Sequence, residues 1–157
     1  VIVHEHKLLY LHQAPVRRGA VAEIGRASVE REGSDVTIVA TMLMVHRALQ
    51  AANLLEDEGI SAEVIDLRWI RPLDLPTVTE SVEKTGRLVV AEEQWHDAGW
   101  GATLISRLSM AGASMSAAPR AVSLVDDVLI PYAPPLEDQM LPSPERIAEE
   151  VRASLMS

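Results

Sequence analysis

Cysteine and phenylalanine are absent from this 157-residue sequence, and aromatic residues make up only 3% of it. Without cysteine the chain can form no disulfide bond, no thiolate metal site and no cysteine nucleophile. Because aromatic side chains are scarce, a core must be built from Val, Ile, Leu, Ala and Met. The hydrophobic content of 48% supplies enough of these residues for one globular domain.

Long runs of positive charge and long apolar runs are missing as well. The net charge of −9 argues against a nucleic-acid partner, whose phosphates need a basic surface. The densest basic cluster is the pair Arg17 and Arg18, which is too small for an anionic membrane patch. The longest strongly apolar run, residues 36–45, is about half the length of a membrane span. These patterns argue against membrane and nucleic-acid contacts. The expected location is the cytoplasm of a bacterial-type cell.

The sequence begins inside an apolar, strand-like run at residues 1–3, without an initiator methionine. It also lacks the charged region and cleavage site of a signal peptide. We therefore expect the chain to be a fragment of a longer protein. Residues 11–35 carry four structure-breaking residues, and this composition predicts a linker with one short strand near residues 27–30.

Strand-like and helix-like segments alternate regularly after Gly33. Apolar runs predict strands over 36–40, 62–67, 87–91 and 121–125. Helical spacing predicts helices over 43–58, between Asp74 and Gly86, over 101–110 and after Ser143. Asp74 and Ser143 are typical helix N-caps, and Gly86 is a typical helix end. This alternation indicates an α/β fold with a mostly parallel sheet covered by helices on both faces.

Ligands of such sheets usually lie at the carboxyl ends of the strands, which directs attention to four loops. These loops are residues 41–42, 68–73, 92–100 and 126–135. The first loop has no glycine-rich phosphate motif, and no G-x-S-x-G serine motif occurs anywhere. The histidines lack metal-ligand spacing and are interpreted as solvated or interface residues; they are His4, His6, His12, His46 and His96.

The third loop contains more polar and aromatic side chains that could form a site than the other three loops. Residues 92–101 place two carboxylates, an imidazole and two indoles before a helix start, where an anionic group is favoured. Two interpretations fit this stretch equally well. It is either a wall of an active site or a subunit contact, or it is an ordinary strand–helix turn with Trp95 in the core. Loop 130–135 is rich in proline and is predicted to be extended, as a partner contact or a surface crossover. Arg68 and Arg71 are predicted mainly to form ion pairs with Asp66 or Asp74.

Several strings resemble the beta subunit of the decarboxylating component of 2-oxo acid dehydrogenase complexes. They are EHKLLY, REGSDVTIV, MVHRAL, EGISAEVIDLR, IRPLD, KTGRLVVAEE and DDVLIPYA. The resemblance implies that residues 1–12 are the tail of an upstream pyrimidine-binding domain and 13–34 a linker with an edge strand. Residues 35–157 would then form a transketolase C-terminal-like domain: a three-layer α/β/α sandwich with a mostly parallel five-stranded sheet and an antiparallel fifth strand.

The resemblance further implies oxidative decarboxylation of a 2-oxo acid with acyl transfer to lipoamide. Thiamine diphosphate and Mg²⁺ would serve the complete enzyme, and neither is expected to bind this fragment. The implied partners are an alpha subunit, a second beta subunit and a lipoyl acyltransferase core. The chain alone is expected to be inactive, with no catalytic residue of its own. A rim of the active site or a subunit interface is predicted at His46, Arg68, Glu93, Trp95, His96, Pro131 and Tyr132.

Two other interpretations stay open. The chain could be the equivalent domain of a transketolase or a deoxyxylulose-phosphate synthase, for which Arg68 and Arg71 are the candidate phosphate ligands. It could also be a non-catalytic association module. The Trp95-His96 pair departs from the pair that is usual in the beta subunits, so no residue-specific role is assigned to it. The segment 11–22 also departs from the usual linker, which leaves the subfamily and its 2-oxo acid substrate undecided.

Overall fold

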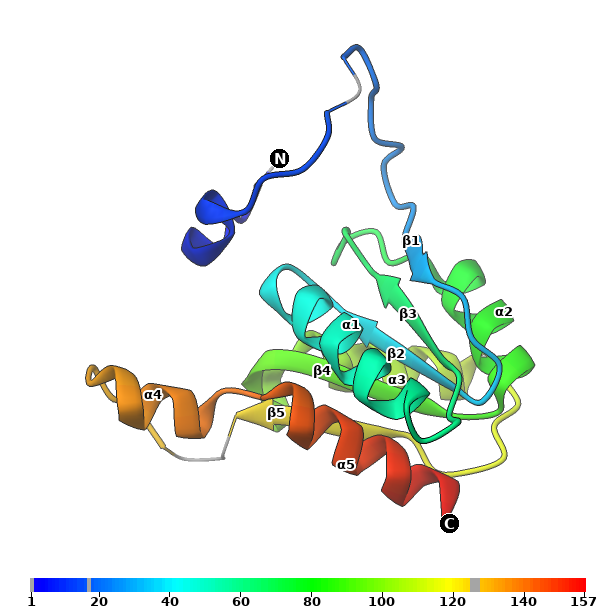
Figure 1. Cartoon of the computed structure of the whole chain (residues 1–157). Coiled ribbons are helices and arrows are strands. Elements are labelled where there is room, and N and C mark those ends of the chain that lie inside the picture. Colours follow the sequence, from blue (N-terminus) through cyan, green and yellow to red (C-terminus); the bar gives the residue numbers. More distant parts are fainter. Residues whose placement is uncertain (1, 17, 125–127) are drawn as a thin grey trace.

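The computed structural model describes residues 2–16, 18–124 and 128–157. The chain forms a short 3-10 helix at its start, then a β/α alternation, and it ends on two helices (Figure 1). The elements are η1 Lys7–Leu11, β1 Ser28–Arg31, β2 Val36–Ala40, α1 Leu43–Glu56, β3 Ala62–Asp66, α2 Leu75–Thr85, β4 Leu88–Trp95, η2 His96–Ala98, α3 Trp100–Met110, β5 Arg120–Leu124, α4 Pro134–Met140 and α5 Pro144–Leu155. Within the described ranges, no helix is long and apolar enough to cross a membrane.

The five strands form one mixed sheet in the order β1-β3-β2-β4-β5. Strand β1 runs antiparallel to β3, whereas β3, β2, β4 and β5 are parallel to one another. The predicted mostly parallel sheet with an antiparallel fifth strand is therefore confirmed. The central strand β2 is buried along its whole length because it has neighbours on both sides and helices on both faces.

Two hydrophobic clusters, one on each face of the sheet, give the sandwich its three layers. Helices α1 and α5 cover one face, where Leu55 and Ile147 are fully buried. Helices α2 and α3 cover the other face, where Val82 and Leu104 are fully buried. Figure 1 shows α1 and α5 lying together on the near side of the sheet. Because aromatic side chains are few, aliphatic residues fill both clusters.

Local sequence signals at Asp74, Gly86 and Ser143 set three of the predicted helix ends. The Asp74 carboxylate accepts a hydrogen bond from the Thr77 amide at 3.2 Å, and α2 ends at Gly86 with a φ of 73°. The Ser143 hydroxyl accepts from the Arg146 amide at 3.2 Å and begins α5. The predicted helix 43–58 ends at Glu56, two residues earlier than expected.

Three predicted segments differ in the structure. Strand β4 continues to Trp95, past the expected end at Ala91. The proline-rich loop is extended only up to Ala133, because the helix α4 begins directly at Pro134. Proline is tolerated at the first helical positions, where its missing N–H would have no partner inside the helix. Residues 2–3 form no strand, and residues 1 and 125–127 of the predicted segments lie outside the described ranges.

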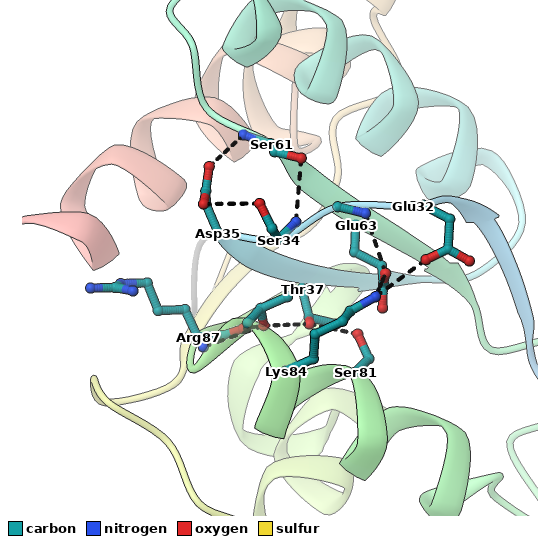
Figure 2. Close-up of polar contacts among 11 residues, drawn as sticks. Glu32, Ser34, Asp35, Thr37, Ser61, Glu63, Ser81, Lys84 and Arg87 are labelled. Atoms are coloured by element: carbon teal, nitrogen blue, oxygen red, sulfur yellow. Dashed lines mark hydrogen bonds and ion pairs between the residues drawn. The ribbon is translucent and has the colours of Figure 1, made fainter.

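A polar network occupies the amino-terminal edge of the sheet (Figure 2). The buried Glu63 carboxylate pairs with Lys84, which also donates to Glu32 at 3.2 Å. Burial alone would raise the pKa of Glu63, but hydrogen bonds from Lys84, Ser81 and the Gly33 amide outweigh it and lower that pKa. The network is thus internally satisfied, and it joins the segment before β2 to β3 and α2.

Candidate functional site

Three of the four predicted loops converge at the carboxyl-terminal edge of the sheet and line a cavity of about 610 Å³. The end of β2 contributes Thr41 and Met42, and the segment after β3 contributes Arg68 and Ile70. The amino-terminal segment closes one side. The complete lining is His4, Glu5, His6, Thr41, Met42, Asp66, Arg68, Ile70, Glu93, Gln94 and Trp100. We call this space the carboxyl-edge cavity. The prediction that ligand chemistry should be sought at these loops agrees with the position of the cavity.

The fourth loop contributes to a neighbouring hollow instead. Residues 126 and 127 lie outside the described ranges, and Ile130 lines a second cavity of about 470 Å³. This second cavity shares Glu5, His6 and Glu93 with the first. Helix α4 supplies Glu137 and Asp138 to its wall, which also contains the basic residues Lys7 and Arg47.

The backbone is strained at two points of the carboxyl-edge cavity. Met42 has a φ of 52° and Arg68 a φ of 54°, and in the described part of the chain no other non-glycine residue has a positive φ. Arg68 is the centre of a tight turn in which the Trp69 amide donates to the Leu67 carbonyl at 2.5 Å. Such conformations cost energy and tend to persist where a site requires them.

Arg68 is held by carboxylates on both sides. Its guanidinium lies 3.3 Å from Glu30 and 3.7 Å from Asp66, so the predicted pairing with Asp66 is confirmed. Burial raises the pKa of Asp66, and the negative charge of Glu30 adds to this effect, while Arg68 opposes it. The resulting cluster places one positive charge between two negative ones at the rim of the cavity.

The start of α3 is already occupied by a carboxylate of the chain itself. Glu92 is fully buried, and its carboxylate accepts hydrogen bonds from the Gly101 amide at 3.0 Å and the Ser123 hydroxyl at 3.3 Å. The glycines are required here, because a Cβ atom at Gly99 would lie 2.3 Å from the Glu92 carboxylate. The predicted preference of this helix start for an anionic group is met within the chain, by the carboxyl group of Glu92.

Replacing Glu92 with glutamine should flatten part of the pH dependence of stability. Burial raises the pKa of Glu92, against hydrogen bonds from Gly101 and Ser123 that lower it. A raised folded-state pKa means that Glu92 favours the folded state at low pH, and this contribution is lost as the pH rises through that pKa. As the pH rises above the ordinary pKa of glutamate, about 4.3, the wild type should therefore lose stability relative to Glu92→Gln. Urea unfolding at several pH values measures this, and the exposed Glu149→Gln controls for the lost charge. A constant difference between wild type and Glu92→Gln would contradict it.

The other predicted site residues are spread around this edge rather than gathered at one point. Glu93 lines both cavities and pairs with His6 at 3.3 Å. The His46 ring on α1 stacks on His12, with 4.6 Å between the ring centroids. Trp95 is 43% exposed, so the alternative that places it in the core is wrong. His96 begins η2, and Pro131 and Tyr132 lie on the loop before α4, where Tyr132 is fully exposed.

Of the residues that line the carboxyl-edge cavity, the predicted rim contains only Arg68 and Glu93. Asp66 is predicted only as a partner of Arg68, and Met42 and Trp100 fall within two of the four predicted loops without a predicted role of their own. Trp100 is 8% exposed, and its Nε1 is the one buried side-chain nitrogen or oxygen without a hydrogen-bond partner in the described ranges. A missing acceptor leaves no trace in a sequence, so no motif could have revealed it.

Thiamine diphosphate and Mg²⁺, which the sequence resemblance implies for a complete enzyme, do not fit the described residues. No group of three or more His, Asp or Glu side chains among them is arranged to hold a metal ion. Three carboxylates, from Glu5, Asp66 and Glu93, line the carboxyl-edge cavity and would repel a diphosphate. We therefore derive no cofactor chemistry from this chain.

Beta subunits of pyruvate and acetoin enzymes are similar to nearly the whole chain in sequence. The pyruvate dehydrogenase E1 component subunit beta of Rickettsia bellii is 42% identical over 97% of this chain and 47% of its own length. The acetoin:2,6-dichlorophenolindophenol oxidoreductase subunit beta of Cupriavidus necator is 41% identical over 99% of this chain and 46% of its own length. The chain thus spans about half the length of the curated relatives it matches.

Solved structures agree at the level of the fold. A split-gene transketolase, described as an inactive beta4 tetramer, superimposes with a TM-score of 0.78 and 32% identity over 90% of this chain and 46% of that one. Residues 25–147 match the family described as the transketolase, C-terminal domain. That match begins before β1 and ends within α5, so it covers all five strands. The chain therefore belongs to the transketolase C-terminal domain family.

Proposed function

We propose that this chain is the C-terminal domain of a 2-oxo acid dehydrogenase beta subunit and supports oxidative decarboxylation mainly by assembling the enzyme. The observation that carries the proposal is the similarity of nearly the whole chain to beta subunits of pyruvate and acetoin enzymes. In the complete enzyme, acting in the cytoplasm, thiamine diphosphate with Mg²⁺ supplies the decarboxylation chemistry. The acyl group is then passed to lipoamide.

Under this proposal the chain offers two surfaces to other subunits. The first is the assembly loop, which we define as Leu129, Ile130, Pro131 and Tyr132 together with Leu136 on α4. Leu129 is 82% exposed and Tyr132 is fully exposed, so these two side chains contribute little to packing within the described chain. The second surface is the rim formed by Glu93, Trp95 and His96, with His46 and Arg68 beside it. The partners would be an alpha subunit, a second beta subunit and the lipoyl acyltransferase core.

The chain alone should have no turnover. It supplies no group of metal ligands among its described residues, and the split-gene transketolase relative is described as an inactive beta4 tetramer. Adding the matching alpha subunit and the remaining part of the beta subunit should restore thiamine-dependent decarboxylation. Assays with pyruvate and with a branched-chain 2-oxo acid, each with and without the chain, measure this. Turnover by the chain without partners would overturn the proposal.

One observation favours a second candidate. The structural relative with the TM-score of 0.78 is a transketolase encoded by split genes, and transketolases act on sugar phosphates such as the xylulose 5-phosphate of the Pichia stipitis structure. Transfer of a two-carbon unit between sugar phosphates by the reassembled enzyme, without decarboxylation of any 2-oxo acid, would favour this candidate over the dehydrogenase.

A further inference from the structure

We propose that two arginines, Arg47 on α1 and Arg146 on α5, are positioning residues that fix the orientation of α4 and of the assembly loop before it. The hydrogen bonds that support this inference lie within the chain. Its bearing on assembly rests on the proposed function, because the assembly loop is the surface offered there to other subunits. We call the two arginines, together with the backbone carbonyl groups that they bind, the arginine clamp.

Helix α4 is not held in place by burial. It has seven residues, and none of them is buried. A helix of this length is marginal in water unless other contacts support it. Figure 1 shows α4, in orange, beyond the end of the sheet. The orientation of α4 therefore depends on contacts at its ends.

A single guanidinium binds both ends of the segment that carries α4. Arg146 donates to the Ser123 carbonyl at 3.2 Å and to the Met140 carbonyl at 3.3 Å. Ser123 lies near the end of β5, and Met140 is the last residue of α4. A guanidinium is planar and has several N–H donors, so one side chain can hold both carbonyls at once. The carbonyl of Met140 would otherwise have no partner inside the helix, because the last carbonyls of a helix never do.

Arg47 fixes the connection from α4 to α5 from the other side. Its guanidinium donates to the Pro142 carbonyl at 2.6 Å. Leu141, between α4 and Pro142, is buried, and its amide donates to the Glu137 carbonyl at 3.1 Å. The residues directly after α4 are therefore bound from α1, whereas the last residue of α4 is bound from α5.

The clamp gives the assembly loop a defined position without help from its own side chains. Tyr132 is fully exposed and Leu129 is mostly exposed, so neither anchors the loop to the described chain. Because α4 begins two residues after Tyr132, its orientation sets where this side chain points. A surface that is ordered before binding loses less conformational entropy when a partner binds. The clamp should therefore strengthen assembly although it lies outside the assembly loop.

Amide hydrogen exchange on the full chain tests the clamp without any partner. Arg146→Lys keeps the positive charge, but its single nitrogen does not reproduce the planar fork. Arg47→Met keeps the apolar stem and removes the donor. Each variant should speed exchange of the Glu137 and Leu141 amides, which bond along α4, about tenfold. Exchange of the amides of β2 should stay unchanged.

Arg152→Lys is the matched control on the same helix. Its guanidinium also makes a two-point contact, with the Glu58 carboxylate at 2.9 and 2.6 Å, but it takes no part in the clamp. This variant should leave exchange in α4 as in the wild type. Unchanged exchange in both clamp variants, or an equal increase in Arg152→Lys, would overturn the proposal.

Binding of the reassembled beta subunit to the alpha subunit tests the role in assembly. Arg146→Lys should weaken binding about tenfold, whereas it should have little further effect in a Tyr132→Asp background, because both changes act through the same surface. Equal effects in the two backgrounds would overturn the positioning role. If the wild type does not bind the alpha subunit, the proposed function fails, and the exchange result still decides whether the clamp orders α4.

Discussion

Replacing Gly33 with alanine should lower the free energy of unfolding by about 3 kcal/mol, because the new methyl group would collide with the backbone of β3. A Cβ atom at this position would lie 2.2 Å from the Glu63 amide nitrogen and 2.3 Å from the Ala62 carbonyl carbon. Strand β3 cannot move aside, since it is paired to β1 on one side and to β2 on the other. The segment carrying Gly33 would therefore have to move instead.

That movement would also loosen the polar network of Figure 2. The Gly33 amide donates to the Glu63 carboxylate at 3.3 Å, and losing this bond leaves the buried carboxylate with fewer donors. Urea unfolding at neutral pH measures the change. Gly112→Ala is the matched control, because its φ is 76° but a Cβ there meets no atom within 4 Å. That control should cost only about 1 kcal/mol of backbone strain. Equal losses in the two variants would contradict the steric explanation.

Replacing Tyr132 with aspartate should weaken assembly with the alpha subunit about a hundredfold while leaving the stability of the chain unchanged. Tyr132 is fully exposed, so the fold does not depend on it. Under the proposed function it lies in the assembly loop, and an exposed tyrosine at the centre of an interface can contribute about 2 kcal/mol or more to binding. Burying an unpaired aspartate in its place adds a desolvation penalty.

Affinity measurements between the reassembled beta subunit and the alpha subunit test this, together with thermal unfolding of each variant. Met110→Asp is the control, since Met110 is 86% exposed but lies at the end of α3, outside the assembly loop. We expect Met110→Asp to bind and turn over like the wild type. If Tyr132→Asp also binds normally, the assembly loop is not the contact surface, and the rim around Glu93 becomes the better candidate.

The sequence predicted those strands and helix ends that depend on interactions between residues close together in the chain. Strand β2 agrees residue by residue with its apolar run, and Asp74, Gly86 and Ser143 set helix ends through contacts within a few residues. Strand β1 has no such pattern: only its two end residues are half-buried, and it is held to β3 by backbone pairing. Composition predicted a short strand near residues 27–30, and only the family resemblance predicted its antiparallel direction. Helix α4 was missed because Pro134 and Pro135 were interpreted as helix breakers, whereas they occupy the first helical positions.

The location of the candidate site in the fold was predicted from the sequence, but most of the residues that line it were not. Loop positions after parallel strands led to Arg68 and Glu93, and both line the carboxyl-edge cavity. Met42 is distinguished by its positive φ and Trp100 by its unpaired indole nitrogen. Neither property can be inferred from residue type or spacing. Glu92 and Glu93 are adjacent carboxylates with opposite environments, because successive side chains of a strand point to opposite faces.

The antiparallel strand β1 has a consequence for how the chain can be shortened. It covers the outer edge of β3, whose N–H and C=O groups would otherwise face solvent in a row. A version of the chain that begins at Asp35, the start of the predicted domain, would keep both hydrophobic clusters but uncover this edge. An open, regular strand edge is a template for pairing with another molecule. Such a shortened chain should therefore self-associate through β3 and aggregate, although its core is complete.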